Sequence, residues 1–114
     1  MRALVTGGGG FLGGAILGQL NEYASVRRSF SRGSYPELTA QGVEHFQGSL
    51  TDYDALQEAV EGMDVVFHTA ALPGAWGHYD TYFQANVVGS RNVVKAAIAH
   101  GVKAIVYTST PSVV

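Results

Sequence analysis

The spacing of apolar residues changes twice near the start of the chain. A nearly continuous apolar run over residues 2–6 is followed by four glycines, and apolar residues then recur at helical spacing. A continuous run is typical of a strand buried on both faces, whereas a spacing of about three to four residues is typical of a helix packed on one side. The pattern predicts a strand at 2–6, a tight turn and a helix over about 10–22.

The same alternation continues along the rest of the chain. Further strands are predicted at 26–30, 43–47, 64–68 and 104–107. Loops are expected at 31–36 and 72–79, a helix between the cap Asp52 and the end Gly62, and a long helix at 80–100. Alternating strands and helices predict an α/β fold of Rossmann type. We expect a parallel sheet of order 3-2-1-4-5, with right-handed crossovers and helices on both faces.

The predicted helix at 80–100 is apolar or small over much more than half of its circumference. Its narrow exposed stripe consists of Gln84, Val88, Arg91, Lys95 and Ala99. A helix this apolar is covered on more than one side. Either another helix of the same chain or one from a second subunit should cover it, and we expect a homo-oligomer formed through this helix.

Composition and charge exclude several classes of protein. The 114 residues are 46% hydrophobic and 14% charged, which is ordinary for one globular domain over 1–114. A net charge of -2 gives no reason to expect nucleic acid or an anionic membrane as partner. The absence of cysteine excludes disulfides, thiolate catalysis and zinc-thiolate sites, and no metal site is expected. The uncharged stretch 3–21 holds seven glycines, which argues against a membrane span, so we expect a soluble, cytoplasmic protein.

The glycine turn is the candidate binding site. Gly7 permits a sharp turn, Gly10 lets the backbone approach a pyrophosphate, and Gly13 lets the helix lie close to the strand. The phosphates would face the free N–H groups of the first helical turn. A flexible linker is the alternative, but these glycines separate two apolar segments rather than polar ones. No Lys-Ser or Lys-Thr follows them, which excludes a Walker-type phosphate loop.

The end of the second strand is where a dinucleotide fold meets the adenosine ribose. An acidic residue there would bind the ribose 2′-hydroxyl, but this chain has Ser31 and Arg32. Because a bidentate guanidinium suits phosphate, Arg32 favours NADP(H) over NAD(H), with Arg28 as a weaker second candidate. The alternative is that these arginines are simply solvated. His68, at the end of the fourth strand, is expected to be packed or hydrogen-bonded rather than catalytic.

Several separated segments resemble one family, the extended short-chain dehydrogenase/reductases. The stretch 6–13 (TGGGGFLG) resembles their TGxxGxxG signature, and 66–71 (VFHTAA) resembles their fourth-strand motif. The stretch 86–93 (NVVGSRNV) is similar to their Asn-Val-x-Gly-Thr-x-Asn helix, and 106–114 to the end of their fifth strand. The resemblance covers the whole chain. It is strongest to the NAD(P)-dependent epimerase/dehydratases that include 3β-hydroxysteroid dehydrogenase-like reductases.

The resemblance implies a role for individual residues. It places the nicotinamide dinucleotide against Gly7, Gly10, Phe11, Leu12, Gly13, Leu50, Ala70 and Ala71. It also places Asn86 beside the active site, Ser109 close to the nicotinamide, and Thr110 at the catalytic Ser/Thr position that hydrogen-bonds the substrate oxygen. The implied activity is hydride transfer to or from a small hydroxyl or carbonyl substrate.

Two departures from the family pattern limit this expectation. Ser49 stands where the family usually has an Asp that reaches the adenine amino group, and no Tyr is followed four residues later by Lys. Without that Tyr–Lys pair, hydride transfer lacks its acid–base partner. We therefore expect the amino-terminal part of a longer enzyme, without its last strands and substrate region. The alternatives are a stand-alone dinucleotide-binding sensor and a truncated product that assembles through its long helix.

Overall fold

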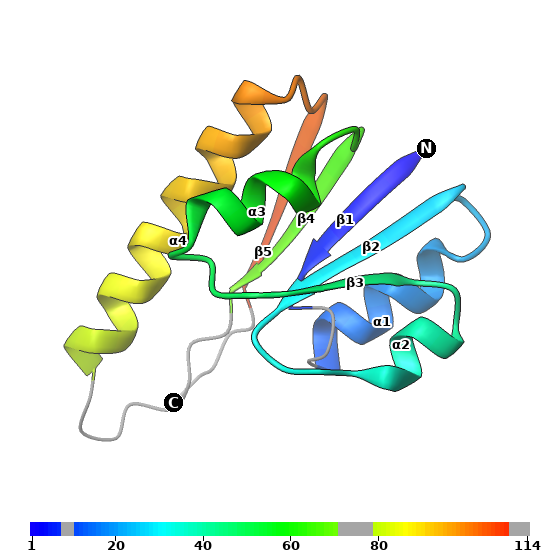
Figure 1. Ribbon diagram of the computed structural model, residues 1–114, viewed down its shortest axis with the longest axis horizontal. Helices are drawn as coiled ribbons and strands as arrows, with labels where there is room; N and C mark the ends of the chain where they lie inside the picture. The colour runs from blue at the N-terminus through cyan, green and yellow to red at the C-terminus, as the bar shows by residue number, and fades with distance from the viewer. Residues whose placement is uncertain (8–10, 71–78, 110–114) are drawn as a thin grey trace.

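A computed structural model describes residues 1–7, 11–70 and 79–109 (Figure 1). Five parallel strands form one sheet: β1 (Arg2–Thr6), β2 (Val26–Ser31), β3 (Glu44–Gln47), β4 (Val65–Ala70) and β5 (Ala104–Ser109). The helices are α1 (Phe11–Leu20), α2 (Pro36–Ala40), α3 (Tyr53–Val60) and α4 (Tyr79–Ala99). The strand order is β3-β2-β1-β4-β5, so the predicted α/β class and topology are confirmed.

The core lies on both faces of the central strands, because successive side chains of a strand point to opposite faces. On one face Leu4 and Val66 pack against α3 and α4 through residues such as Leu56 and Val93. On the other face Ala3 and Val5 pack against α1 and α2. Figure 1 shows these two pairs of helices lying apart, one beside β4 and β5 and the other beside β2 and β3. The sheet is therefore covered from both faces at its centre.

Helix α2 is an element that the sequence analysis missed. Pro36 occupies its first turn, where a missing backbone N–H costs nothing, and Leu38 is its one buried residue. The chain leaves the helix through Gly42, whose φ of 84° favours glycine. A helix of five residues with one apolar contact leaves too short a pattern to recognise. The first helix also ends earlier than predicted, at Leu20.

A buried arginine joins the ends of α1 and α2. Arg27 on β2 donates from Nη1 to the carbonyl of Leu17, at 3.0 Å, and from Nη2 to the carbonyl of Gln41, at 2.6 Å. Both carbonyls lie at helix carboxyl ends, where backbone acceptors lack partners within the helix. The guanidinium therefore satisfies two helix ends at once and is itself compensated for its burial.

The described part of the chain covers helix α4 on only one side. Val93, Ala96 and Ala97 are buried, whereas Val94 is 46% exposed and Ile98 is 75% exposed. The neighbouring edge strand β5 is also open, with Tyr107 at 60% exposed. No helix within the described residues fills the second side that the sequence analysis expected to be covered. None of the helices described is long and apolar enough to cross a membrane.

Candidate functional site

Four of the residues that the sequence analysis singled out lie where strands end. In a parallel sheet all carboxyl ends lie at one edge, and ligands of open α/β sheets bind outside that edge. Gly7 follows β1, Ser31 ends β2, and Ala70 and Ser109 are register partners at the ends of β4 and β5. The fold thus brings segments distant in sequence to one edge.

Gly7 has a backbone conformation and surroundings that only glycine suits. Its φ is 75°, in the left-handed region, and its N–H donates to the carbonyl of Phe30 at 2.7 Å. A Cβ at this position would overlap the hydroxyl oxygen of Thr69. Gly7 therefore packs against both neighbouring strands, β2 and β4.

A chain of buried hydrogen bonds holds the end of β1. The Thr6 hydroxyl accepts from the Thr69 N–H at 3.1 Å and lies 2.7 Å from His68 Nδ1. His68 Nε2 lies 2.9 Å from the Ser90 hydroxyl of α4. The Thr6 hydroxyl proton needs an acceptor, and Nδ1 of His68 is the acceptor in reach. His68 then carries its own proton on Nε2 and donates it to the Ser90 hydroxyl. The neutral imidazole then links β1, β4 and α4.

His68 is buried and hydrogen-bonded, as the sequence analysis expected. Its ring also lies 5.4 Å from the ring of Tyr107, between centroids. Burial lowers the pKa of His68 below its ordinary value of 6.5, because the charged form loses its hydration. The group is therefore neutral at pH 7, in agreement with the hydrogen-bond arrangement.

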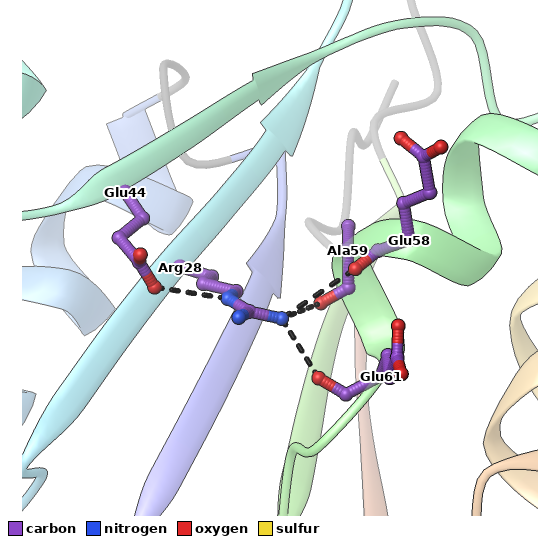
Figure 2. Close-up of polar contacts among 5 residues, drawn as sticks. All are labelled: Arg28, Glu44, Glu58, Ala59 and Glu61. Atoms are coloured by element: carbon purple, nitrogen blue, oxygen red, sulfur yellow. Dashed lines mark hydrogen bonds and ion pairs between the residues drawn. The ribbon is translucent and has the colours of Figure 1, made fainter.

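Arg28 has a structural contact network that argues against its predicted secondary role in phosphate binding. Its Nη1 donates to the carbonyls of Ala59 and Glu61, at 3.1 and 2.8 Å, and more weakly to Glu58 (Figure 2). Its Nε pairs with the Glu44 carboxylate at 3.0 Å. The guanidinium also lies 5.2 Å from the centre of the Phe46 ring. Arg28 is thus committed to the carboxyl end of α3, where a cation is stabilising.

Ser31 and Arg32 lie at the end of β2 without such commitments. The Ser31 hydroxyl is buried and has no hydrogen-bond partner among the described residues. Arg32 is exposed, and within the described part of the chain its guanidinium has neither an ion pair nor a hydrogen bond. An anionic group that reached both side chains would give each of them the partner that it lacks among the described residues.

Leu50 is held in place from α4. Its carbonyl accepts from Asn92 Nδ2 at 2.8 Å, and its side chain fills the space that a Cβ on Gly89 would need. The neighbouring Ser49 hydroxyl bonds Thr51, through the hydroxyl at 2.8 Å and the N–H at 3.2 Å. Ser49 therefore supports the turn before α3, and Asn92 is a supporting residue that the sequence analysis did not identify.

The remaining predicted site residues are placed to different degrees. Leu12 is half-buried and Gly13 buried in the first turn of α1. The structure assigns Phe11, Ala70, Asn86 and Ser109 to their helix or strand. Gly10, Ala71 and Thr110 lie outside the described residues. The proposed contacts of these nine residues stay predictions.

Comparison with known proteins gives one family. The sequence model of the 3-beta hydroxysteroid dehydrogenase/isomerase family matches residues 4–114. A 2-alkyl-3-oxoalkanoate reductase of Stenotrophomonas maltophilia is 53% identical over 99% of this chain and 34% of its own length. The chain spans about a third of the length of the curated relatives it matches.

Solved structures give the same fold with two different nucleotides. The triphenylmethane reductase of a Citrobacter species, complexed with NADP(H), has a TM-score of 0.76 and 31% identity over 94% of this chain and 36% of its own. A mutant uronate dehydrogenase of Agrobacterium tumefaciens, complexed with NAD, has a TM-score of 0.78 and 29% identity over 96% of this chain and 40% of its own. The similarity thus includes proteins that bind either form of the coenzyme.

Proposed function

The chain belongs to the 3-beta hydroxysteroid dehydrogenase/isomerase family, and on that basis we propose that residues 1–114 form the dinucleotide-binding part of an NADP(H)-dependent reductase or dehydrogenase. The observation that carries the proposal is the turn at Gly7. Its φ of 75° and the lack of room for a Cβ keep position 7, directly after β1, free of a side chain, and in this fold the dinucleotide pyrophosphate binds at the turn after the first strand.

The residues present suit the cofactor. Gly7, Gly10 and Gly13 would lie along the pyrophosphate, with Leu12 beside them, and the first turn of α1 would offer its free N–H groups. The buried Ser31 hydroxyl, which has no partner within residues 1–7, 11–70 and 79–109, would gain a hydrogen-bond partner. Ala70, Ala71, Leu50, Asn86 and Ser109 would border the rest of the cofactor, as the resemblance implies.

The preference for NADP(H) rests on the different environments of three arginines. Arg27 holds α1 and α2, and Arg28 holds α3, whereas the Arg32 side chain is exposed at the end of β2. Arg32 would pair with a 2′-phosphate and the Ser31 hydroxyl would donate to it. The NADP(H) complex of triphenylmethane reductase supports this form, and the NAD complex of uronate dehydrogenase keeps NAD(H) as the alternative.

The proposed reaction is hydride transfer between the nicotinamide and a small hydroxyl or carbonyl substrate. The bound coenzyme would supply or accept the hydride, and Thr110 would hydrogen-bond the substrate oxygen. The name of the Stenotrophomonas relative, a reductase of an oxo acid, supports a carbonyl substrate. The 114 residues contain no Tyr four residues before Lys, so we propose that they bind the coenzyme without turning it over by themselves.

Titration of the chain with NADPH and NADH tests the proposal. We expect saturable binding of both, tighter for NADPH, and no carbonyl reduction. Arg32→Ala should reduce the NADPH/NADH affinity ratio by about 10- to 100-fold, the range for a lost charge-assisted hydrogen bond. Arg91→Ala, at an exposed arginine of α4, is the matched control.

Three results would contradict parts of this proposal. Absence of binding by either nucleotide would reject the dinucleotide site. An unchanged affinity ratio in Arg32→Ala would reject the 2′-phosphate contact. Rapid carbonyl reduction by the chain alone would show that a different acid–base group replaces the Tyr–Lys pair. Binding without any reductase activity in the whole protein would favour the sensor alternative.

A further inference from the structure

We propose that His45 and Gln47, on the edge strand β3, set the coenzyme preference by holding the backbone of the loop that carries Arg32. Both residues bond main-chain carbonyls of that loop. Gln47 Nε2 donates to the carbonyl of Arg32 at 3.0 Å, and His45 Nε2 donates to the carbonyl of Gly33 at 2.8 Å. This inference rests on the proposed 2′-phosphate contact of Arg32.

The register of the sheet makes these two contacts possible. Ser29 and Ser31 on β2 are the partners of His45 and Gln47 on β3, so the two β3 residues are two positions apart and share one face. The loop after Ser31 turns back over this face. Two consecutive carbonyls of the loop, at positions 32 and 33, thus receive donors from two alternate residues of one strand.

The loop is closed further by an aromatic contact. The rings of Tyr35 and His45 meet edge to face, with 5.7 Å between their centres. A Cβ on Gly33 would come within 2.9 Å of the Tyr35 ring, so the glycine lies directly against that ring. Gly33, Tyr35 and His45 therefore form one packed unit, which fixes the chain immediately after Arg32.

Fixing the backbone matters because Arg32 is otherwise unconstrained. Its side chain is exposed and makes no hydrogen bond or ion pair among the described residues. Binding a ligand through a long side chain costs conformational entropy of both the side chain and the backbone. If the backbone is already held, its share of that entropy is lost before binding, and the affinity is higher. His45 and Gln47 are thus positioning residues, and their effect should fall on the nucleotide that carries the 2′-phosphate.

The test compares variants that remove each donor at nearly constant size. Gln47→Met keeps the length of the side chain, and His45→Phe keeps the ring against Tyr35, but neither retains the N–H. Each should weaken NADPH binding by about 3- to 10-fold, the effect of one net hydrogen bond, and change NADH binding by less than about 2-fold. His45→Gln, whose Nε2 can still donate, should restore the preference. Gln19→Met, at an exposed glutamine of α1, is the matched control.

Adenosine 2′,5′-bisphosphate and 5′-AMP repeat the comparison without the nicotinamide. In each variant the affinity for the bisphosphate should change by the same factor as the affinity for NADPH, and the affinity for 5′-AMP by the same factor as that for NADH. Because Gln47 is exposed, Gln47→Met retains the fold and decides the case even if His45→Phe does not fold.

The outcomes separate this inference from the proposed function. If Arg32→Ala lowers the NADPH/NADH ratio while Gln47→Met and His45→Phe leave it unchanged, only the positioning role is rejected. If both nucleotides weaken equally in Gln47→Met, its role is structural and the inference fails. If Arg32→Ala itself leaves the ratio unchanged, the 2′-phosphate contact and the inference built on it fail together.

Discussion

Gly7 at the end of β1 lies directly against the Thr69 hydroxyl of β4, which in turn donates to the carbonyl of Thr6 at 2.5 Å. The side chain that excludes a Cβ from residue 7 therefore also holds the residue before it. The Thr69 side chain therefore both anchors the end of β1 and keeps position 7 free of a side chain.

Replacement of Gly7 by Ala should destabilise the protein and abolish tight nucleotide binding. The left-handed conformation costs an alanine about 1–2 kcal/mol, and Thr69 must move in addition. Urea unfolding and NADPH titration measure the two effects. Gly18→Ala is the control, because open space surrounds Gly18 within α1, and this change should stabilise the helix by about 0.5–1 kcal/mol. Equal effects of the two substitutions would contradict the importance of the turn.

Replacement of Arg28 by Met should lower the free energy of unfolding without changing coenzyme preference. The variant leaves the carbonyls of Ala59 and Glu61 without their donor, and loss of charged hydrogen bonds costs about 1.5–3 kcal/mol. Denaturant unfolding measures the loss, and the NADPH/NADH ratio should stay at the value of the unmodified protein. Glu44→Gln should cost less than about 1 kcal/mol, since that carboxylate is largely exposed. A changed NADPH/NADH affinity ratio in Arg28→Met would instead support a role for Arg28 in binding the 2′-phosphate.

Acidification below pH 6.5 should destabilise the protein through His68. Burial lowers its pKa in the folded state, so the unfolded chain takes up the proton first as the pH falls. The contribution of His68 is complete above pH 6.5 and declines from there down to the folded-state pKa, by at most about 1.4 kcal/mol per pH unit. Unfolding free energies measured from pH 8 to pH 5 should show this slope.

The variant His68→Gln identifies the source of that slope. Glutamine keeps a donor and an acceptor between Thr6 and Ser90 but does not titrate in this range. Its unfolding free energy should depend less on pH between 6.5 and 5 than that of the unmodified protein. The same slope in both proteins would assign the effect to other groups.

The strand order and the glycine turn could be predicted because they depend on local pattern. Apolar runs of strand length alternate with segments of helical spacing, and the glycines that follow the first run indicate a turn without any knowledge of tertiary contacts. The roles of Arg27 and Arg28 could not be predicted in the same way. Adjacent residues of a strand point to opposite faces, and which helix end each one meets depends on tertiary packing.

The positioning contacts of β3 show the same limit. His45 and Gln47 meet the carbonyls after Ser31 only because β2 and β3 pair in one particular register. A register shift of one residue would turn both side chains to the opposite face. Nothing in the sequence around either residue specifies that register, so the contacts became visible only in the folded chain.

The buried guanidinium of Arg27 has a consequence for how the protein opens. It is hydrogen-bonded to the last turn of α1 and to the end of α2, so neither end can separate from the sheet without leaving a buried cation short of an acceptor. The two helix ends should therefore unfold as one cooperative unit. In native-state hydrogen exchange, amides of both helix ends should share a single opening free energy, although Leu17 and Gln41 are 24 positions apart in the sequence.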